Sequence, residues 1–162
     1  MLEPKTHAPR AIKLYFEDFQ PGQVREARGP TLTEREIVEF ARLYDPQPFH
    51  IDAEAARQSP YGGIIASGWQ TGCIAMRLMC ELYLLEAASL GSPGVDEIRW
   101  TKPVRPGDTL NMKMTVLETK ISRSRPNMGS VRSRWEVFNQ HGELVMHMTG
   151  WGLFARRRSE DR

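Results

Sequence analysis

The sequence contains very few cysteines, and this scarcity limits what can hold the fold together. Among 162 residues only Cys73 and Cys80 are cysteines, too few for a disulfide framework or a four-thiolate metal centre. They lie within an apolar segment at a spacing that puts both on one helical face. We interpret them as reduced core residues. A chain of this length buries roughly two-thirds of its unfolded surface, so we expect neither a metal nor a resident cofactor.

Long hydrophobic runs are also missing. The most apolar stretch, residues 74–85, is interrupted by Arg77 and Glu81 and is shorter than the roughly 20 residues that a membrane span requires. Residues 1–10 carry charges and prolines but no apolar core of signal-peptide length. We therefore predict a flexible N-terminus over residues 1–10, no transmembrane helix, no membrane partner and a cytoplasmic location.

The sequence has no strong excess of charge of either sign, since the net charge is only +2 at pH 7. Its densest basic run begins at Arg156 and is followed by acidic residues, so residues 156–162 are predicted to form a solvated, charged tail. No nucleic-acid partner is expected. Other arginines are either a patch for phosphate groups or the polar edge of a sheet; they are Arg123, Arg125, Arg132 and Arg134.

Residues 11–155 are expected to form one domain whose first half contains the helices. Thr33 and Glu36 make a capping box ahead of a helix that should end at Asp45, because Pro46 disfavours helical dihedrals in the preceding residue. The two prolines of this segment predict a stiff, extended loop through Pro48.

Two further helices are predicted after this loop. Asp52 can cap a short helix over residues 53–57, and a long helix should begin near Ser67. From Trp69 to Ala87 apolar residues cover most of the circumference of this long helix. We expect other structure to wrap it.

The second half of the domain has the period-two pattern of strands. Alternation runs over residues 110–116, 131–137 and 145–154, and Asn139 to Gly142 form a hairpin turn between the last two. Few helices followed by hairpin-connected strands predict an α+β domain in which one antiparallel sheet packs against one long helix.

The segment from Asp45 to His50 concentrates groups that can carry chemistry. An acid, the amide of Gln47 and an imidazole lie close together in it, and on a stiff loop the acid and the imidazole can point into one cleft. The alternative is structural: Asp45 caps a chain end, and His50 satisfies backbone groups in a turn.

A second segment, Gly63 to Trp69, leads into the predicted long helix. The first N–H groups of a helix lack intrahelical partners and lie at the positive end of the dipole, so they can hold a developing oxyanion. Gly68 is placed to donate, and Ser67 is interpreted as the helix cap.

Together these segments resemble the MaoC-like dehydratases, a family that includes R-specific enoyl-CoA hydratases with a hotdog fold. The resemblance covers most of the chain. It rests on Asp45, Gln47-Pro48, His50 and the turn Gly63–Gly68, with further support from residues 102–110 and 139–142. Two departures are that the family often has Asn at Gln47 and His at Ser67.

The resemblance implies a hotdog domain that adds water reversibly and in syn fashion to a trans-2-enoyl thioester, giving the (R)-3-hydroxyacyl thioester. The substrate would be carried on coenzyme A or an acyl carrier protein, without a cofactor. Asp45 and His50 would share the water, and the Gly68 N–H would hold the thioester carbonyl. Gln47 would bind the water or orient His50.

Substrate-binding residues are proposed around this centre. Gly63 is one candidate, and Ile64, Ile65 and Trp69 are candidates for the wall that contacts the acyl group, although Trp69 equally suits plain packing. The phosphates of coenzyme A would meet scattered cations, and the loop around Arg123 is alternatively a polar hairpin tip. The candidate cations are Lys102, Arg105, Arg123 and Arg125.

Two other functions compete with hydration. A hotdog thioesterase would direct water at the thioester carbon, and a non-catalytic domain would bind an acyl thioester without turning it over. In every case we expect a homodimer or a dimer of dimers that pairs through sheet edges and central helices.

Overall fold

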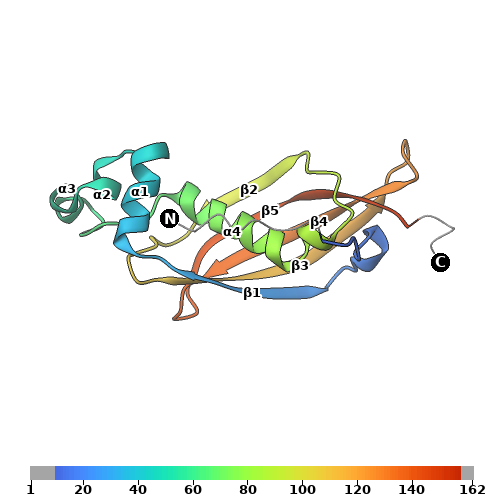
Figure 1. Cartoon of the computed structure of the whole chain (residues 1–162), viewed down its shortest axis with the longest axis horizontal. Helices are drawn as coiled ribbons and strands as arrows, with labels where there is room; N and C mark the ends of the chain where they lie inside the picture. The colour runs from blue at the N-terminus through green and yellow to red at the C-terminus, as the bar shows by residue number, and fades with distance from the viewer. Residues whose placement is uncertain (1–9, 158–162) are drawn as a thin grey trace.

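One antiparallel sheet carries the long helix α4 across one of its faces (Figure 1). This computed structural model describes residues 10–157. The strands hydrogen-bond in the order β1-β3-β4-β5-β2, which leaves β1 and β2 at the edges. The strands are β1 (Val24–Thr31), β2 (Gly94–Trp100), β3 (Thr109–Ile121), β4 (Met128–Phe138) and β5 (Leu144–Ala155). The helices are η1 (Phe16–Asp18), α1 (Glu34–Tyr44), α2 (Pro48–Ile51), α3 (Ala53–Gln58), α4 (Gly68–Leu82) and η2 (Leu84–Glu86).

The predicted α+β hotdog arrangement is confirmed. The three alternating segments lie within β3, β4 and β5, and their inward residues, such as Met114 and Val137, pack in the core with Leu78 of α4. Burying such side chains fully is worth about 1.5–3 kcal/mol each. The edge strand β2 escaped prediction because most of its residues are exposed and do not alternate.

The starts of the helices follow their caps. Thr33 and Glu36 form the predicted capping box, and α1 ends at Tyr44. The Ser67 hydroxyl accepts a hydrogen bond from the Trp69 N–H at the start of α4. The predicted extent to Ala87 is wrong, because the helix stops at Leu82. There the backbone turns, and the ring of Tyr83, the next residue, is buried edge-on against Phe19 in the core.

The predicted extended loop through Pro48 is also wrong. Only Asp45, Pro46 and Gln47 separate α1 from the single helical turn α2, and Pro48 is the first residue of that turn. Proline suits this position because its fixed φ matches the helix and its missing N–H would have no helical partner. His50 is therefore presented by a helical turn.

Helix α4 is not wrapped on all sides by this chain. Trp69 is 61% exposed and Met76 is 45% exposed, and Cys73 lies exposed on the same face. The interpretation of Cys73 as a core residue is thus wrong. An apolar helix face with exposed side chains is available for another surface.

The start of the predicted solvated tail is bound to the domain. Arg156 pairs with Glu17, and Arg157 pairs with Asp18 of η1. This part of the tail prediction is wrong, because both guanidinium groups form ion pairs with carboxylates of η1. The predicted flexible segment 1–10, apart from Arg10, and residues 158–162 lie outside the described residues. Within residues 10–157, no helix combines the length and the apolar character needed to cross a membrane.

Candidate active site

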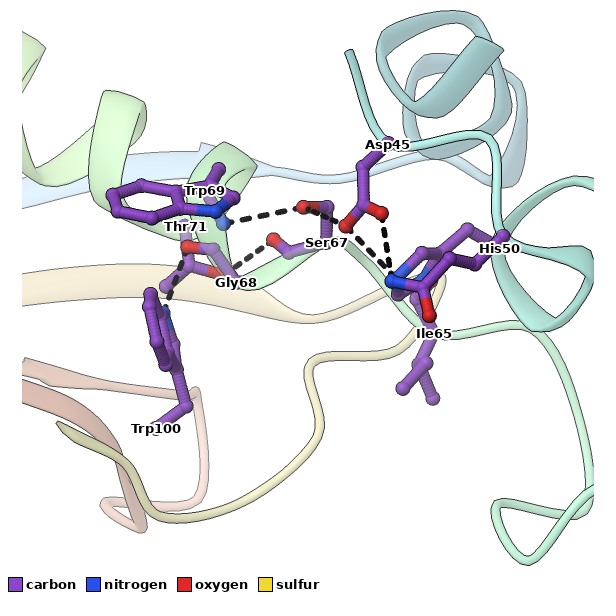
Figure 2. Close-up of polar contacts among 9 residues, drawn as sticks. Asp45, His50, Ile65, Ser67, Gly68, Trp69, Thr71 and Trp100 are labelled. Atoms are coloured by element: carbon purple, nitrogen blue, oxygen red, sulfur yellow. Dashed lines mark hydrogen bonds and ion pairs between the residues drawn. The ribbon is translucent and has the colours of Figure 1, made fainter.

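Asp45 and His50 meet at one end of α4 (Figure 2). Asp45 is the C-terminal cap of α1, and His50 lies in α2. The distance between His50 Nε2 and Asp45 Oδ2 is 3.3 Å. Both line a cavity of about 570 Å³, here called the site cleft, together with Gln47, Ile65, Gly68, Trp69, Trp100 and Lys102 among others. The structure therefore brings the acid and the imidazole into one cleft.

The His50 ring is fixed by its other nitrogen. Nδ1 lies 2.7 Å from the carbonyl oxygen of Ile65, and the side chain is almost fully buried. A carbonyl oxygen only accepts, so Nδ1 carries the proton and donates it to Ile65. Nε2 lies 3.3 Å from Asp45 Oδ2 and donates to the carboxylate when the ring is protonated. In the neutral ring Nε2 and Oδ2 are both acceptors, and a water beside the pair can donate one O–H to each.

The Asp45 carboxylate is held at both of its oxygens. The Gln47 amide donates to Oδ1 at 2.7 Å, and the Ser67 hydroxyl donates to Oδ2 at 2.7 Å. Burial raises the pKa of Asp45, but the hydrogen bonds from Gln47 and Ser67 and the neighbouring His50 outweigh burial, so that the pKa lies below its ordinary value. Asp45 is therefore a carboxylate at neutral pH.

Ser67 combines two roles, of which the sequence indicated one. Its hydroxyl caps α4 as predicted, and it also donates to Asp45, 22 residues earlier in the chain. Figure 2 shows Ser67 between Asp45 and the start of α4. For the contact with Asp45, the only signal in the sequence was the position of Ser67 before the turn glycine. At this position the MaoC-like dehydratases often have another polar residue, His.

Gly68 is the first residue of α4 and lines the same cleft. Its N–H is among those that have no partner within the helix. A side chain is excluded here, because a Cβ on Gly68 would lie 2.6 Å from the Trp100 ring. The predicted donor thus stands at the positive end of a helix, beside the Asp45–His50 pair.

The structure places some of the other predicted binding residues at the site cleft and others away from it. Gln47 reaches Asp45 rather than His50, and Ile65 lines the site cleft. Ile64 belongs to the core, and Gly63 lies beside the Arg105 guanidinium instead of in the lining of the cleft. These two are not brought to the cleft.

The predicted cations fall into two groups. Lys102 lines the site cleft, and Arg105 donates to the Tyr61 carbonyl at its border. Arg123 and Arg125 lie in the exposed hairpin between β3 and β4, at the end of the sheet away from α2 (Figure 1). Within one chain, only the first group is near the site.

A second cavity, of about 410 Å³, lies between α4 and the sheet. We call it the helix–sheet cavity; its lining includes Trp69, Gly72, Met79, Trp135 and Met148. Trp69 also lines the site cleft, so the two hollows share this side chain. Among the described residues, none with a charged side chain lines the helix–sheet cavity. It suits an apolar group.

Residues 10–157 contain no cluster of three or more His, Cys, Asp or Glu side chains placed to hold a metal ion. The cleft presents a carboxylate, an imidazole and a helix N-terminus, groups that can move a proton and hold a developing oxyanion.

Comparisons with known proteins add to this geometry. A family model described as "MaoC like domain" matches residues 18–136. A mesaconyl-CoA hydratase from Cereibacter sphaeroides is 41% identical over 160 residues, which are 94% of this chain and 43% of that protein. A 3-hydroxybutyryl-CoA dehydratase from Methylorubrum extorquens is 29% identical over 143 residues, covering 85% of this chain and 86% of that protein. The crystal structure of a MaoC-like dehydratase from Rhodospirillum rubrum matches with a TM-score of 0.84 and 39% identity, covering 90% of this chain and 99% of that one.

Proposed function

Because this chain belongs to the MaoC-like dehydratase family, we propose that it is a hydro-lyase that adds water reversibly to a trans-2-enoyl thioester and yields the (R)-3-hydroxyacyl thioester. The names of its relatives support hydratase or dehydratase chemistry in general. The single observation that carries the specific proposal is the convergence of Asp45, His50 and the N-terminus of α4 on one cleft.

The thioester carbonyl is proposed to accept a hydrogen bond from the Gly68 N–H. Electron density drawn toward this oxygen makes the β-carbon of the enoyl group electrophilic. A backbone donor aimed at an enolate-like oxygen is worth about 3–4 kcal/mol of transition-state stabilisation. The dipole of α4 adds to this effect because the donor lies at its positive end.

The attacking water is proposed to lie beside the Asp45–His50 pair, within reach of both side chains. Its two O–H groups satisfy the carboxylate and the Nε2 lone pair, which orients the oxygen toward the β-carbon. The oxygen bonds to the β-carbon, one water proton passes to the Asp45–His50 pair, and the pair returns a proton to the α-carbon. Both additions come from one face, so the addition is syn.

The acyl group is proposed to extend past Trp69 into the helix–sheet cavity. Because charged side chains are missing from the described lining of this cavity, an uncharged acyl group is favoured there. The carrier end leaves the cleft toward Lys102 and Arg105, which suit phosphate groups of coenzyme A. No resident cofactor takes part in this scheme.

Incubation with crotonyl-CoA tests the proposal. We expect loss of the enoyl absorbance without release of free thiol, and a drop of about 10²–10⁴-fold in rate for both Asp45→Asn and His50→Ala, in line with the usual contribution of general acid–base groups. Circular dichroism checks that both variants are folded. Full activity in either variant would contradict the assignment. Thiol release would favour a thioesterase, and thermal stabilisation by the ligand without turnover would favour a binding domain.

The chain is further proposed to work in the cytoplasm as a homodimer or a dimer of dimers. Trp69 and Met76 of the exposed face of α4 line the helix–sheet cavity together with Val95 of edge strand β2, which is 58% exposed. An open strand edge beside exposed apolar side chains favours pairing with a second copy.

A further inference from the structure

We propose that Trp100, at the end of edge strand β2, is a positioning residue: by fixing the Gly68–Trp69 peptide it limits rotation about Gly68 and so keeps the adjacent Gly68 N–H in the orientation needed to hold the thioester oxygen. This inference rests on the proposed function, because it assigns Trp100 a part in that reaction. The Trp100 indole lies against the turn that begins α4 (Figure 2).

The first observation is a direct hydrogen bond. Trp100 Nε1–H donates to the Gly68 carbonyl oxygen at 2.8 Å, across 32 residues of sequence. The two residues belong to different elements, β2 and α4. The sheet therefore holds the first peptide of the helix by a side chain, in addition to the helix's own bonds.

The second observation is steric. Three ring atoms of Trp100 lie 2.6–2.8 Å from the position that a Cβ on Gly68 would take. Only glycine allows this approach, but glycine alone gives the backbone wide conformational freedom. The indole removes that freedom from one side, because the chain cannot rotate toward a ring already in contact with it.

The third observation is that the bond belongs to a chain of polar contacts that reaches the acid. The peptide between Gly68 and Trp69 is held at both ends: its carbonyl accepts from Trp100, and its N–H donates to the Ser67 hydroxyl at 3.2 Å. Ser67 in turn donates to Asp45 at 2.7 Å. The Trp100 indole thus orients the amide side and the carboxylate side of the cleft relative to each other.

The indole is also held in place. Trp69 packs edge-on against it, with ring centroids 5.4 Å apart and an interplanar angle of 73°. The T-shaped arrangement is one of those that aromatic pairs prefer, so Trp69 helps to hold the indole in this orientation. Since transition-state stabilisation depends on donors aimed in advance, a fixed indole serves the reaction even though Trp100 itself is not assigned a contact with the substrate.

Trp100→Phe tests this role by keeping an aromatic ring and removing the N–H donor. We expect kcat for hydration of crotonyl-CoA to fall about tenfold while KM stays within about twofold, because the loss acts on orientation in the transition state rather than on binding. Arg99→Gln is the matched control: it removes an exposed donor from the neighbouring residue of β2, whose partner is Glu97. The control should keep the wild-type kcat.

A second measurement separates this proposal from the proposed function. Loss of the hydrogen bond should move the Gly68 carbonyl ¹³C resonance upfield in Trp100→Phe and leave it in place in Arg99→Gln, whether or not the protein hydrates crotonyl-CoA. An inactive wild type would overturn the hydratase assignment, but it would not overturn the inference that Trp100 fixes the Gly68–Trp69 peptide. An unchanged Gly68 resonance, or an unchanged kcat in an active protein, would overturn the role of Trp100.

Discussion

At the scale of single residues, the partners of Asp45 determine how the proposed reaction responds to pH. Burial favours the protonated acid, yet donors on both carboxylate oxygens and the nearby imidazole keep the net pKa below its ordinary value. The carboxylate is the form that accepts from water. The same contacts that place the group therefore also keep it ionised.

We expect the rate loss caused by protonation of Asp45 to occur below about pH 4, the ordinary range of an aspartic acid. A folded-state pKa that is depressed contributes stability that is present above the unfolded-state pKa and is lost as the pH falls through the folded-state pKa. The gap in unfolding free energy between wild type and Asp45→Asn should thus shrink on acidification in this range. Denaturant titrations at a series of pH values would measure it, and a gap that widened toward acid would contradict the low pKa.

Ser67→Ala should affect both stability and pH dependence. The variant loses the cap of α4, which costs about 1 kcal/mol, and it removes a donor from Asp45. The pKa of Asp45 should then rise, and the acid limb of the kcat/KM profile should move to higher pH. Ser67→Thr keeps a hydroxyl and serves as the control. If Ser67→Ala lost stability while its profile stayed in place, the hydroxyl would be only a cap.

Sequence reasoning reached some of these residues and missed others for a physical reason. Asp45 and His50 lie close together in the sequence, on either side of Pro46 and Pro48, so local chain geometry was enough to suggest that they meet. The bonds from Ser67 to Asp45 and from Trp100 to Gly68 join residues 22 and 32 positions apart. Such contacts are set by the packing of elements, which no local pattern encodes.

At the scale of elements, the space between α4 and the sheet is the feature that we propose limits which acyl groups can bind. Gly72 lies on α4 in the lining of the helix–sheet cavity, and a Cβ added there meets no atom within 4 Å. A helical glycine without a close neighbour is costly for the helix, by about 1 kcal/mol relative to alanine. The cost is consistent with a position kept open for a ligand.

Gly72→Leu is therefore expected to stabilise the fold and to narrow the substrate range. The leucine side chain improves helix propensity but occupies the cavity, so kcat/KM should fall for long enoyl thioesters more than for crotonyl-CoA. Gly72→Ala is the matched control, with most of the propensity gain and little volume. Equal losses on short and long substrates would show that the acyl group lies elsewhere.

The elements also show where prediction from sequence succeeds. The caps of α1 and α4 and the alternating strands were correct, since each is encoded by neighbouring residues. The turn α2 was missed because Pro48 was interpreted only as a residue that interrupts helices, whereas it also starts them well. Strand β2 was missed because its edge position leaves no buried face to produce alternation.

At the scale of the whole molecule, the exposed face of α4 bears on assembly. The apolar pattern of this helix led to the expectation of a wrapped element, and one chain supplies only part of the cover. A second copy seated on this face would bury Trp69 and Met76. The apolar pattern predicts a covered helix, whereas one chain leaves a face of α4 exposed. This difference favours a dimer.

Met76→Glu should weaken the proposed dimer by placing a charge on this face, because an unpaired carboxylate is costly to bury. Light scattering after size exclusion is expected to give twice the 18.5 kDa chain mass for the wild type and a lower value for the variant. Leu117→Glu, at an exposed apolar position of β3, provides a comparison on another surface. A wild type of single-chain mass would contradict the dimer.

The edge-to-face pair of Trp69 and Trp100 borders the cleft, and this gives the protein a built-in optical probe. Indole emission depends on the polarity around the ring, so a thioester that displaces solvent from these rings should change the intrinsic fluorescence. The signal needs no turnover, and occupancy of the inactive Asp45→Asn protein can be titrated without any label.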